Sequence, residues 1–137
     1  MADRIPALTL WRPWPTCILR CGKDIENRGW ATKHRGWIWL HAGKRFDRDA
    51  LDYAAGEGHT LSAKPADHPT GIVGIARLID VCDASVNKRG CDCGPWAMPG
   101  QYHWALSDVR TVPVVPCNGG QKLWLPGAEL GLETPHG

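Results

Sequence analysis

Long apolar runs are missing from this sequence of 137 residues. No stretch of about 18 apolar residues occurs, so neither a membrane-spanning helix nor a membrane partner is expected. The first six residues, Met1 to Pro6, lack the apolar stretch of a secretory signal, so a cytoplasmic protein is expected. In that compartment the six cysteines are expected to stay reduced, as free thiols or metal ligands rather than disulfides.

A large net charge is also missing, since the total is only +2, but the charges are unevenly distributed. Residues 1–48 hold ten Lys/Arg against four Asp/Glu, whereas residues 49–137 hold six against ten. The basic part also contains most of the eight tryptophans, which favours a surface for a polyanion or a nucleotide. An equally weighted alternative is a solvated basic face with the tryptophans in the core.

Internal repeats and a regular βαβ alternation are absent as well, which argues against a doubly wound sheet. The pattern predicts one helix over residues 14–21 and another from 47 to about 55. Strands are expected at 7–11, 24–28, 37–42, 71–81, 102–109, 111–115 and 122–125. This order favours an α+β fold, a small, mixed and strongly bent β-barrel with flanking helices, over residues 1–127. Residues 128–137 are expected to form a loose tail.

The strongest local pattern lies at residues 11–28. Four residues recur with the spacing of one helix face, and Gly22 can end that helix: Trp14, Cys17, Ile18 and Cys21. Lys23 should therefore emerge just past the helix, while strand periodicity places Glu26 and Arg28 on one face. An ammonium, a carboxylate and a guanidinium are thus predicted to meet beside a ligand cleft.

Several motifs occur in a fixed order around this stretch: Pro13-Trp14, Gly22-Lys23, Glu26-Asn27-Arg28 with Trp30 and Thr32, Arg35-Gly36, and His41-Ala42-Gly43-Lys44. In these motifs the chain resembles the ASCH domain, the homology domain of the activating signal cointegrator, within the PUA-like superfamily. The resemblance implies a PUA-like pseudo-barrel whose cleft, near the first helix, binds RNA or single-stranded nucleic acid. Arg12 stands where family members often have Gln, which adds charge beside the expected cleft.

The expected ligand is RNA, single-stranded DNA or a modified nucleoside, bound by a monomer without a cofactor. Cations can contact phosphates or base edges, a carboxylate can accept from an exocyclic amine, and a tryptophan can stack on a base. The candidate binding residues are Arg12, Trp14, Lys23, Glu26, Arg28, Trp30, His41 and Lys44. The alternative is a structural ion-pair network under a core of tryptophans.

Catalysis is the second hypothesis, with Lys23, Glu26 and His41 as candidates. A ribonuclease could use Lys23 to stabilise a phosphorane and Glu26 or His41 as the general base. Some ASCH proteins resemble amidohydrolases acting on acetylated cytidine, but Glu26 stands where their Thr is found. A carboxylate beside Lys23 also favours the charged ammonium over a nucleophilic amine. Binding is therefore favoured over hydrolysis, and a protein-interaction or structural module is a further alternative.

A metal site is the third hypothesis. Cys82, Cys91 and Cys93 could supply thiolates, with Cys117 far along the chain. Cys-x-Cys differs from the paired Cys-x-x-Cys of common zinc modules, so plain reduced thiols are favoured. The histidines outside the strands are expected to be solvated: His34, His59, His68 and His136.

Overall fold

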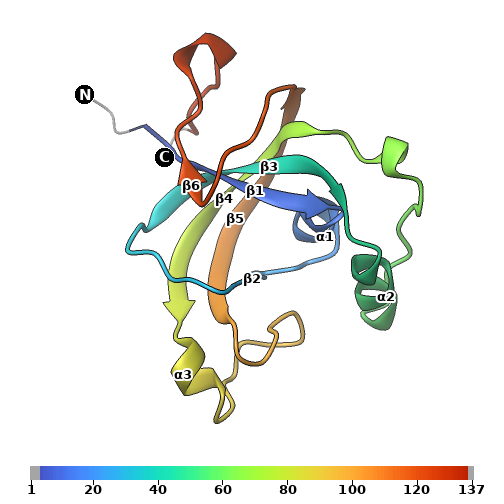
Figure 1. Cartoon of the computed structure of the whole chain (residues 1–137), viewed down its shortest axis with the longest axis vertical. Coiled ribbons are helices and arrows are strands. Elements are labelled where there is room, and N and C mark those ends of the chain that lie inside the picture. The colour runs from blue at the N-terminus through green and yellow to red at the C-terminus, as the bar shows by residue number, and fades with distance from the viewer. Residues whose placement is uncertain (1–3, 136–137) are drawn as a thin grey trace.

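The computed structural model describes residues 4–135, which form one curled six-stranded sheet with three helices (Figure 1). The strands are β1 (Ala7–Arg12), β2 (Ile25–Arg28), β3 (Gly36–Phe46), β4 (Gly71–Cys82), β5 (Tyr102–Val115) and β6 (Leu123–Trp124). The helices are α1 (Trp14–Arg20), α2 (Asp49–Gly56) and α3 (Ala84–Asn87), and two 3-10 turns are η1 (Pro65–Asp67) and η2 (Ala128–Leu130). The expected α+β pseudo-barrel is confirmed.

The sheet is mixed, with the strand order β2-β5-β4-β3-β1-β6. β1 and β3 run parallel, and the other neighbouring strands are antiparallel. The sheet curls strongly, so that α1 lies against the sheet and α2 flanks it, while α3 lies beyond the ends of β4 and β5 (Figure 1). The short strand β2, which carries the predicted charged residues, lies at one edge of this sheet.

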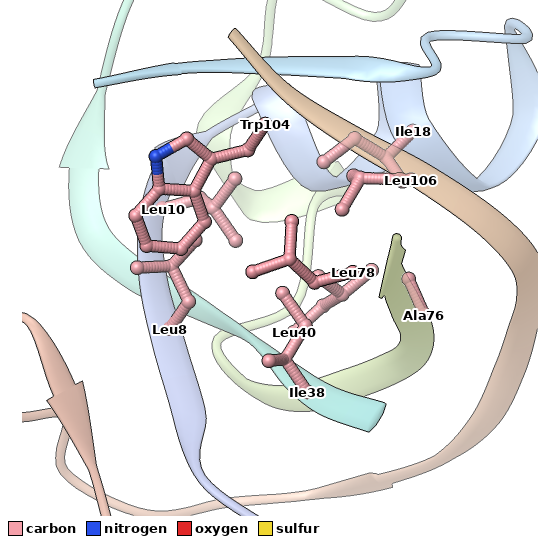
Figure 2. Close-up of a cluster of buried hydrophobic side chains, with 9 residues drawn as sticks. All are labelled: Leu8, Leu10, Ile18, Ile38, Leu40, Ala76, Leu78, Trp104 and Leu106. Atoms are coloured by element: carbon pink, nitrogen blue, oxygen red, sulfur yellow. The ribbon is translucent and has the colours of Figure 1, made fainter. Parts of the chain in front are cut away.

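Strand alternation divides the core between the two faces of the sheet. Leu8 and Leu40 belong to a cluster inside the curl, whereas their neighbours Ala7 and Trp39 belong to a cluster on the other side. Figure 2 shows the inner cluster, to which four strands and α1 contribute: Leu8, Leu10, Ile18, Ile38, Leu40, Ala76, Leu78, Trp104 and Leu106. Because both faces of the sheet are covered, the sequences of these strands are nearly continuous apolar runs.

The long strand β5 differs from the sequence prediction of two strands, 102–109 and 111–115. Asp108 has a φ of 50°, and the pairing with β4 shifts register between Ile75 and Arg77 and again between Leu78 and Asp80. Such offsets bend a strand while its pairing continues. The two-strand prediction is therefore wrong, because β5 continues as one strand through a bend near Asp108.

Two segments outside the sheet also differ from the sequence prediction. The segment 85–100, predicted as irregular, begins within the short helix α3. The segment after residue 127, predicted as a loose tail, contains η2 and packs Leu130 and Leu132 against the outer cluster. Among the helices of residues 4–135, none has the length and apolar character needed to cross a bilayer.

Candidate functional site

The helix α1 places Lys23 as the sequence predicts. The helix starts directly after Pro13, and Gly22 takes a φ of 71°, a conformation that costs glycine little. The backbone N–H of Lys23 then donates to the carbonyl of Cys17 at 3.1 Å. This closed helix end turns the Lys23 side chain back under α1, and the residue as a whole is only 2% exposed.

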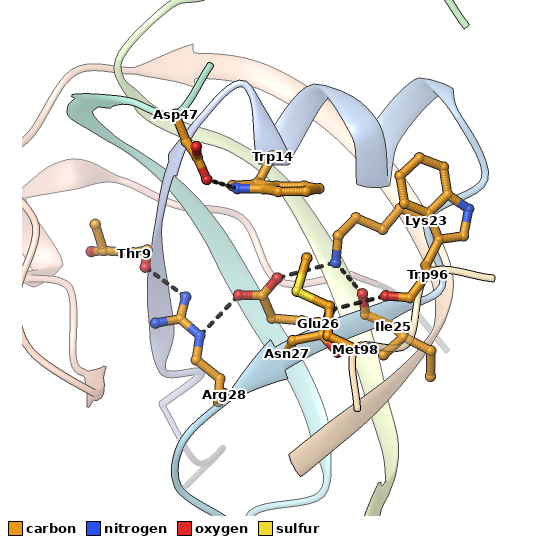
Figure 3. Close-up of polar contacts among 10 residues, drawn as sticks. All are labelled: Thr9, Trp14, Lys23, Ile25, Glu26, Asn27, Arg28, Asp47, Trp96 and Met98. Carbon is orange, nitrogen blue, oxygen red and sulfur yellow. Dashed lines mark hydrogen bonds and ion pairs between the residues drawn. The ribbon is translucent and has the colours of Figure 1, made fainter. Parts of the chain in front are cut away.

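Lys23, Glu26 and Arg28 form one ion-pair network (Figure 3). Lys23 Nζ lies 3.2 Å from Glu26 Oε1, and Arg28 Nε lies 2.9 Å from Glu26 Oε2. The Lys23 ammonium also donates to the carbonyl of Ile25, and Arg28 Nη2 donates to the carbonyl of Thr9 at 2.9 Å. Two cations therefore hold one carboxylate, which leaves the network with a formal charge of +1.

Exposure differs sharply within this network. The side chains of Lys23 and Glu26 are 1% and 10% exposed, whereas that of Arg28 is 23% exposed. Three cavities in the described chain are lined by residues other than these three. The three groups meet as predicted, but they pair with one another, as in the structural alternative, and the Arg28 side chain is the most exposed of the three. Their role in ligand binding stays a prediction.

Trp14 covers the buried end of the network. Its ring centroid lies 5.3 Å from Lys23 Nζ, within the range of a cation–π contact. Its indole N–H donates to Asp47 Oδ2 at 2.8 Å, and Tyr53 packs edge-on against the ring at 5.8 Å. The second oxygen of Asp47 accepts from the backbone N–H of Asp49, at the start of α2. The sequence predicts Asp47 as a helix cap but gives no signal for its contact with Trp14.

Arg12 is bound by the protein's own backbone. Its guanidinium donates to four carbonyls, at distances from 2.6 to 3.0 Å: those of Gly43, Lys44, Pro65 and His68. These bonds tie β1 to the end of β3 and to η1. This framework role accounts for the contacts of Arg12, and its expected role in ligand binding stays a prediction.

Trp30 lies against the core. Its ring packs edge-on against Trp104 at 4.8 Å, and its carbonyl accepts the indole N–H of Trp104. Lys122, which precedes β6, places its ammonium 5.7 Å from the Trp30 ring centroid. The sequence also predicts core positions for Trp37, Trp39 and Trp104. Trp39 and Trp104 are 4% and 0% exposed, whereas Trp37 is half-buried. Trp30 is half-buried, so its contact with Lys122 lies where the core meets solvent.

His41 and Lys44 line a separate cavity of about 680 Å³, together with Thr9, Cys117 and Asn118. His41 is 3% exposed, and both of its ring nitrogens are engaged, Nδ1 with the Thr9 hydroxyl at 3.1 Å and Nε2 with the Cys117 carbonyl at 2.9 Å. Lys44 is exposed. Thr9 thus contacts Arg28 through its carbonyl and His41 through its hydroxyl.

One histidine prediction is wrong. His68, expected to be solvated, is only 7% exposed and bonds to the Thr16 hydroxyl and to the Ser62 carbonyl. The turn at η1 folds back onto α1 and so covers this ring. His34 and His59 are half-buried, and His136 lies outside the described residues.

Apart from Cys117, which lies beside His41, the cysteines fall into two environments. Cys17 of α1 is fully buried, and this burial raises the pKa of its thiol to about 12, with a further rise from Cys21. Cys82, Cys91 and Cys93 lie together at the other end of the sheet. Burial, and then hydrogen bonding with Cys91 and Cys82, raises the pKa of Cys93 to about 12. The sequence groups these three thiols correctly but misses His103, which joins them in space.

The curled mixed sheet, the helix lying against it and the buried Lys-Glu-Arg network define a small α+β pseudo-barrel domain. No family model matches the sequence. Among curated proteins, activating signal cointegrator 1 of Mus musculus is 34% identical over 124 residues, and that of Homo sapiens is 25% identical over 124 residues. Each alignment covers 85% of this chain but 21% of the relative, so the chain spans about a fifth of their length. The similarity to these two relatives supports the ASCH domain that the ordered motifs of the sequence indicate.

Proposed function

We propose that this ASCH domain binds RNA, single-stranded DNA or a modified nucleoside beside the Lys23–Glu26–Arg28 network. The observation that carries the proposal is the side chain of Arg28, which is partly exposed and whose guanidinium is fixed by two hydrogen bonds. Two of its nitrogens are held by Glu26 and by the Thr9 carbonyl, and 23% of its side chain is exposed. A guanidinium fixed in this way loses little conformational entropy when it binds a phosphate or a base edge.

The charge of the network supports an anionic ligand. Lys23 and Arg28 outnumber Glu26, and the ammonium of Lys23 is buried, where water screens its field poorly. The excess positive charge therefore acts at the exposed edge of Arg28. Lys122 over Trp30 adds a second cation beside an aromatic ring, a combination typical of single-stranded nucleic-acid sites.

The names of the relatives agree with this assignment. Both are activating signal cointegrators, and a nucleic-acid-related or coactivator-like role suits a domain of this family. In line with the sequence prediction, the proposed site contains Trp14, Lys23, Glu26, Arg28 and Trp30. His41 and Lys44, beside their own cavity, are proposed to extend the surface along Thr9.

Hydrolysis receives less support from the contacts. A nucleophilic or basic lysine needs a free amine, but the Lys23 ammonium donates to Ile25 and pairs with Glu26. A general base needs a free lone pair, but both ring nitrogens of His41 are engaged by the chain. Binding is therefore the better account of this arrangement.

The test measures binding of labelled single-stranded RNA and DNA 12-mers by fluorescence anisotropy at several salt concentrations. Arg28→Ala should weaken binding by about fivefold to a hundredfold, the range for loss of one bidentate contact. It should also make the salt slope shallower by about 0.7 if one phosphate contact is lost. Arg35→Ala is the matched control, because Arg35 is exposed and donates to carbonyls of its own loop, Thr32 and His34.

Two outcomes would overturn the proposal. One is a folded Arg28→Ala protein whose affinity and salt slope equal those of the unchanged chain. The other is an absence of oligonucleotide binding by the unchanged chain, which would favour a protein-interaction module. The same mixtures, and mixtures with acetylated cytidine, should be analysed for products, because turnover that is lost in Glu26→Gln would rank hydrolysis above binding.

A further inference from the structure

Three cysteines and one histidine meet at the end of the sheet that holds α3. Cys82 ends β4, Cys91 and Cys93 lie in the loop after α3, and His103 is the second residue of β5. One ligand atom from each, three Sγ atoms and a ring nitrogen, all lie within 4.8 Å of one another. Cys82 and His103 are also direct partners in the β4–β5 pairing, which fixes two of the four groups on rigid strands.

These separations suit a tetrahedral metal site. Zinc–sulfur bonds of about 2.3 Å and zinc–nitrogen bonds of about 2.0 Å place tetrahedral ligand atoms roughly 3.5 to 3.8 Å apart. Cys91 Sγ already lies 3.4 Å from His103 Nδ1. A small inward movement of the two loop cysteines would bring the rest of the set to the required separation.

The imidazole of His103 is oriented to act as a ligand. Its Nε2 lies 2.6 Å from the carbonyl of Met98, and a carbonyl can only accept, so Nε2 carries the proton. Nδ1 is therefore the ring nitrogen available to a metal ion, and it is the nitrogen that faces Cys91. A backbone carbonyl that fixes the tautomer in this way is the usual outer-shell partner of a metal-bound histidine. The ring is 2% exposed, so this orientation is also held by packing.

We propose that Cys82, Cys91, Cys93 and His103 bind one structural Zn²⁺ ion. Three sulfurs and one imidazole form a closed set that zinc prefers over harder cations. On binding, the three thiols release their protons to solvent, and the neutral His103 releases none. Cys91 is exposed and Cys82 and Cys93 are half-buried, which gives the ion a route to the site from water.

The ion would close the connection between β4 and β5, most of which lies in the loop after α3. This loop covers the neighbouring edge strand: Trp96 is 4% exposed in a cluster with Ile25, and Trp96 and Met98 both bond to Asn27 of β2. Figure 3 shows Trp96 and Met98 beside Asn27, in the same region as the ion-pair network. Zinc is therefore expected to stabilise the wall of the region that holds Lys23 and Glu26.

The test is metal analysis of the full chain purified without chelator and dialysed against zinc-free buffer. About one zinc per chain is expected, and Cys93→Ser should lower this to below about 0.2, because a closed site needs all four ligands. Cys117→Ser is the matched control, since Cys117 is also a half-buried thiol but lies beside His41. Replacing zinc with Co²⁺ should give the visible bands of tetrahedral cobalt and the near-ultraviolet bands of thiolate coordination.

The proposal fails if the unchanged chain neither retains zinc nor gives this cobalt spectrum. Iron in place of zinc would also overturn the assignment, as would full zinc occupancy in Cys93→Ser. If Cys93→Ser does not fold, Cys91→Ser at the exposed position gives the same readout. Competition of the unchanged chain with a chromogenic chelator decides the matter without any variant, because binding weaker than micromolar would exclude a structural zinc.

Discussion

Asn27 and Met98 are joined by a hydrogen bond of 2.8 Å, in which the Met98 backbone N–H donates to Asn27 Oδ1. The Asn27 amide in turn donates to the Trp96 carbonyl at 2.9 Å. On the far side of the same residue, the Met98 carbonyl accepts from His103. One loop residue thus connects the edge strand β2 with the cysteine–histidine cluster.

Asn27→Ala should therefore loosen the loop as well as lower stability. The variant leaves one donor and one acceptor of the loop backbone without their partner, so the free energy of unfolding should fall by about 1–3 kcal/mol. Urea denaturation measures this loss, and amide hydrogen exchange should be faster at residues 96–98. Asn118→Ala, at an exposed asparagine, is the control and should change neither quantity. Equal exchange rates in the two variants would contradict this role of Asn27.

Loss of the Glu26 carboxylate should be costly because it leaves the Lys23 ammonium buried without a counter-charge. Glu26→Leu is expected to lower the free energy of unfolding by about 3–5 kcal/mol. The double variant Lys23→Met with Glu26→Leu removes both buried charges and should recover a large part of that loss. Denaturation followed by tryptophan fluorescence measures the unchanged chain, the single variants Glu26→Leu and Lys23→Met, and the double variant. Additive effects of the two substitutions would show that the pair is not coupled.

Two glycines with the same backbone angle allow steric crowding to be separated from backbone strain. Gly71 and Gly36 both have a φ of 113° and both begin a strand. A Cβ at Gly71 would lie 2.5 Å from the Val115 carbonyl oxygen, whereas nothing lies within 4 Å of a Cβ at Gly36. Gly36→Ala should cost about 1–3 kcal/mol through strain alone, and Gly71→Ala should cost at least 1 kcal/mol more through the clash. If thermal or urea unfolding shows equal losses of stability for the two variants, β5 can move away from the new Cβ at residue 71 without an energetic cost.

Local patterns in the sequence predicted α1, its end at Gly22 and the edge strand β2, because helix and strand periodicity act over a few residues. The same periodicity placed Glu26 and Arg28 on one face, and the closed helix end brought Lys23 to them. The strand predicted over 71–81, which is β4 in the structure, and the core positions of Trp39 and Trp104 also followed from apolar content. The family resemblance in the ordered motifs agreed with the fold that these elements form.

Tertiary structure alone decided what the charged groups contact and how deeply they lie. Local spacing cannot show that Trp14 donates to Asp47 or that Arg12 donates to four backbone carbonyls, because these contacts join residues far apart in the chain. The bend in β5 and the burial of His68 depend in the same way on packing between segments. His103 illustrates the limit best: the sequence brings three cysteines near one another, but only the pairing of β4 with β5 places the imidazole among them.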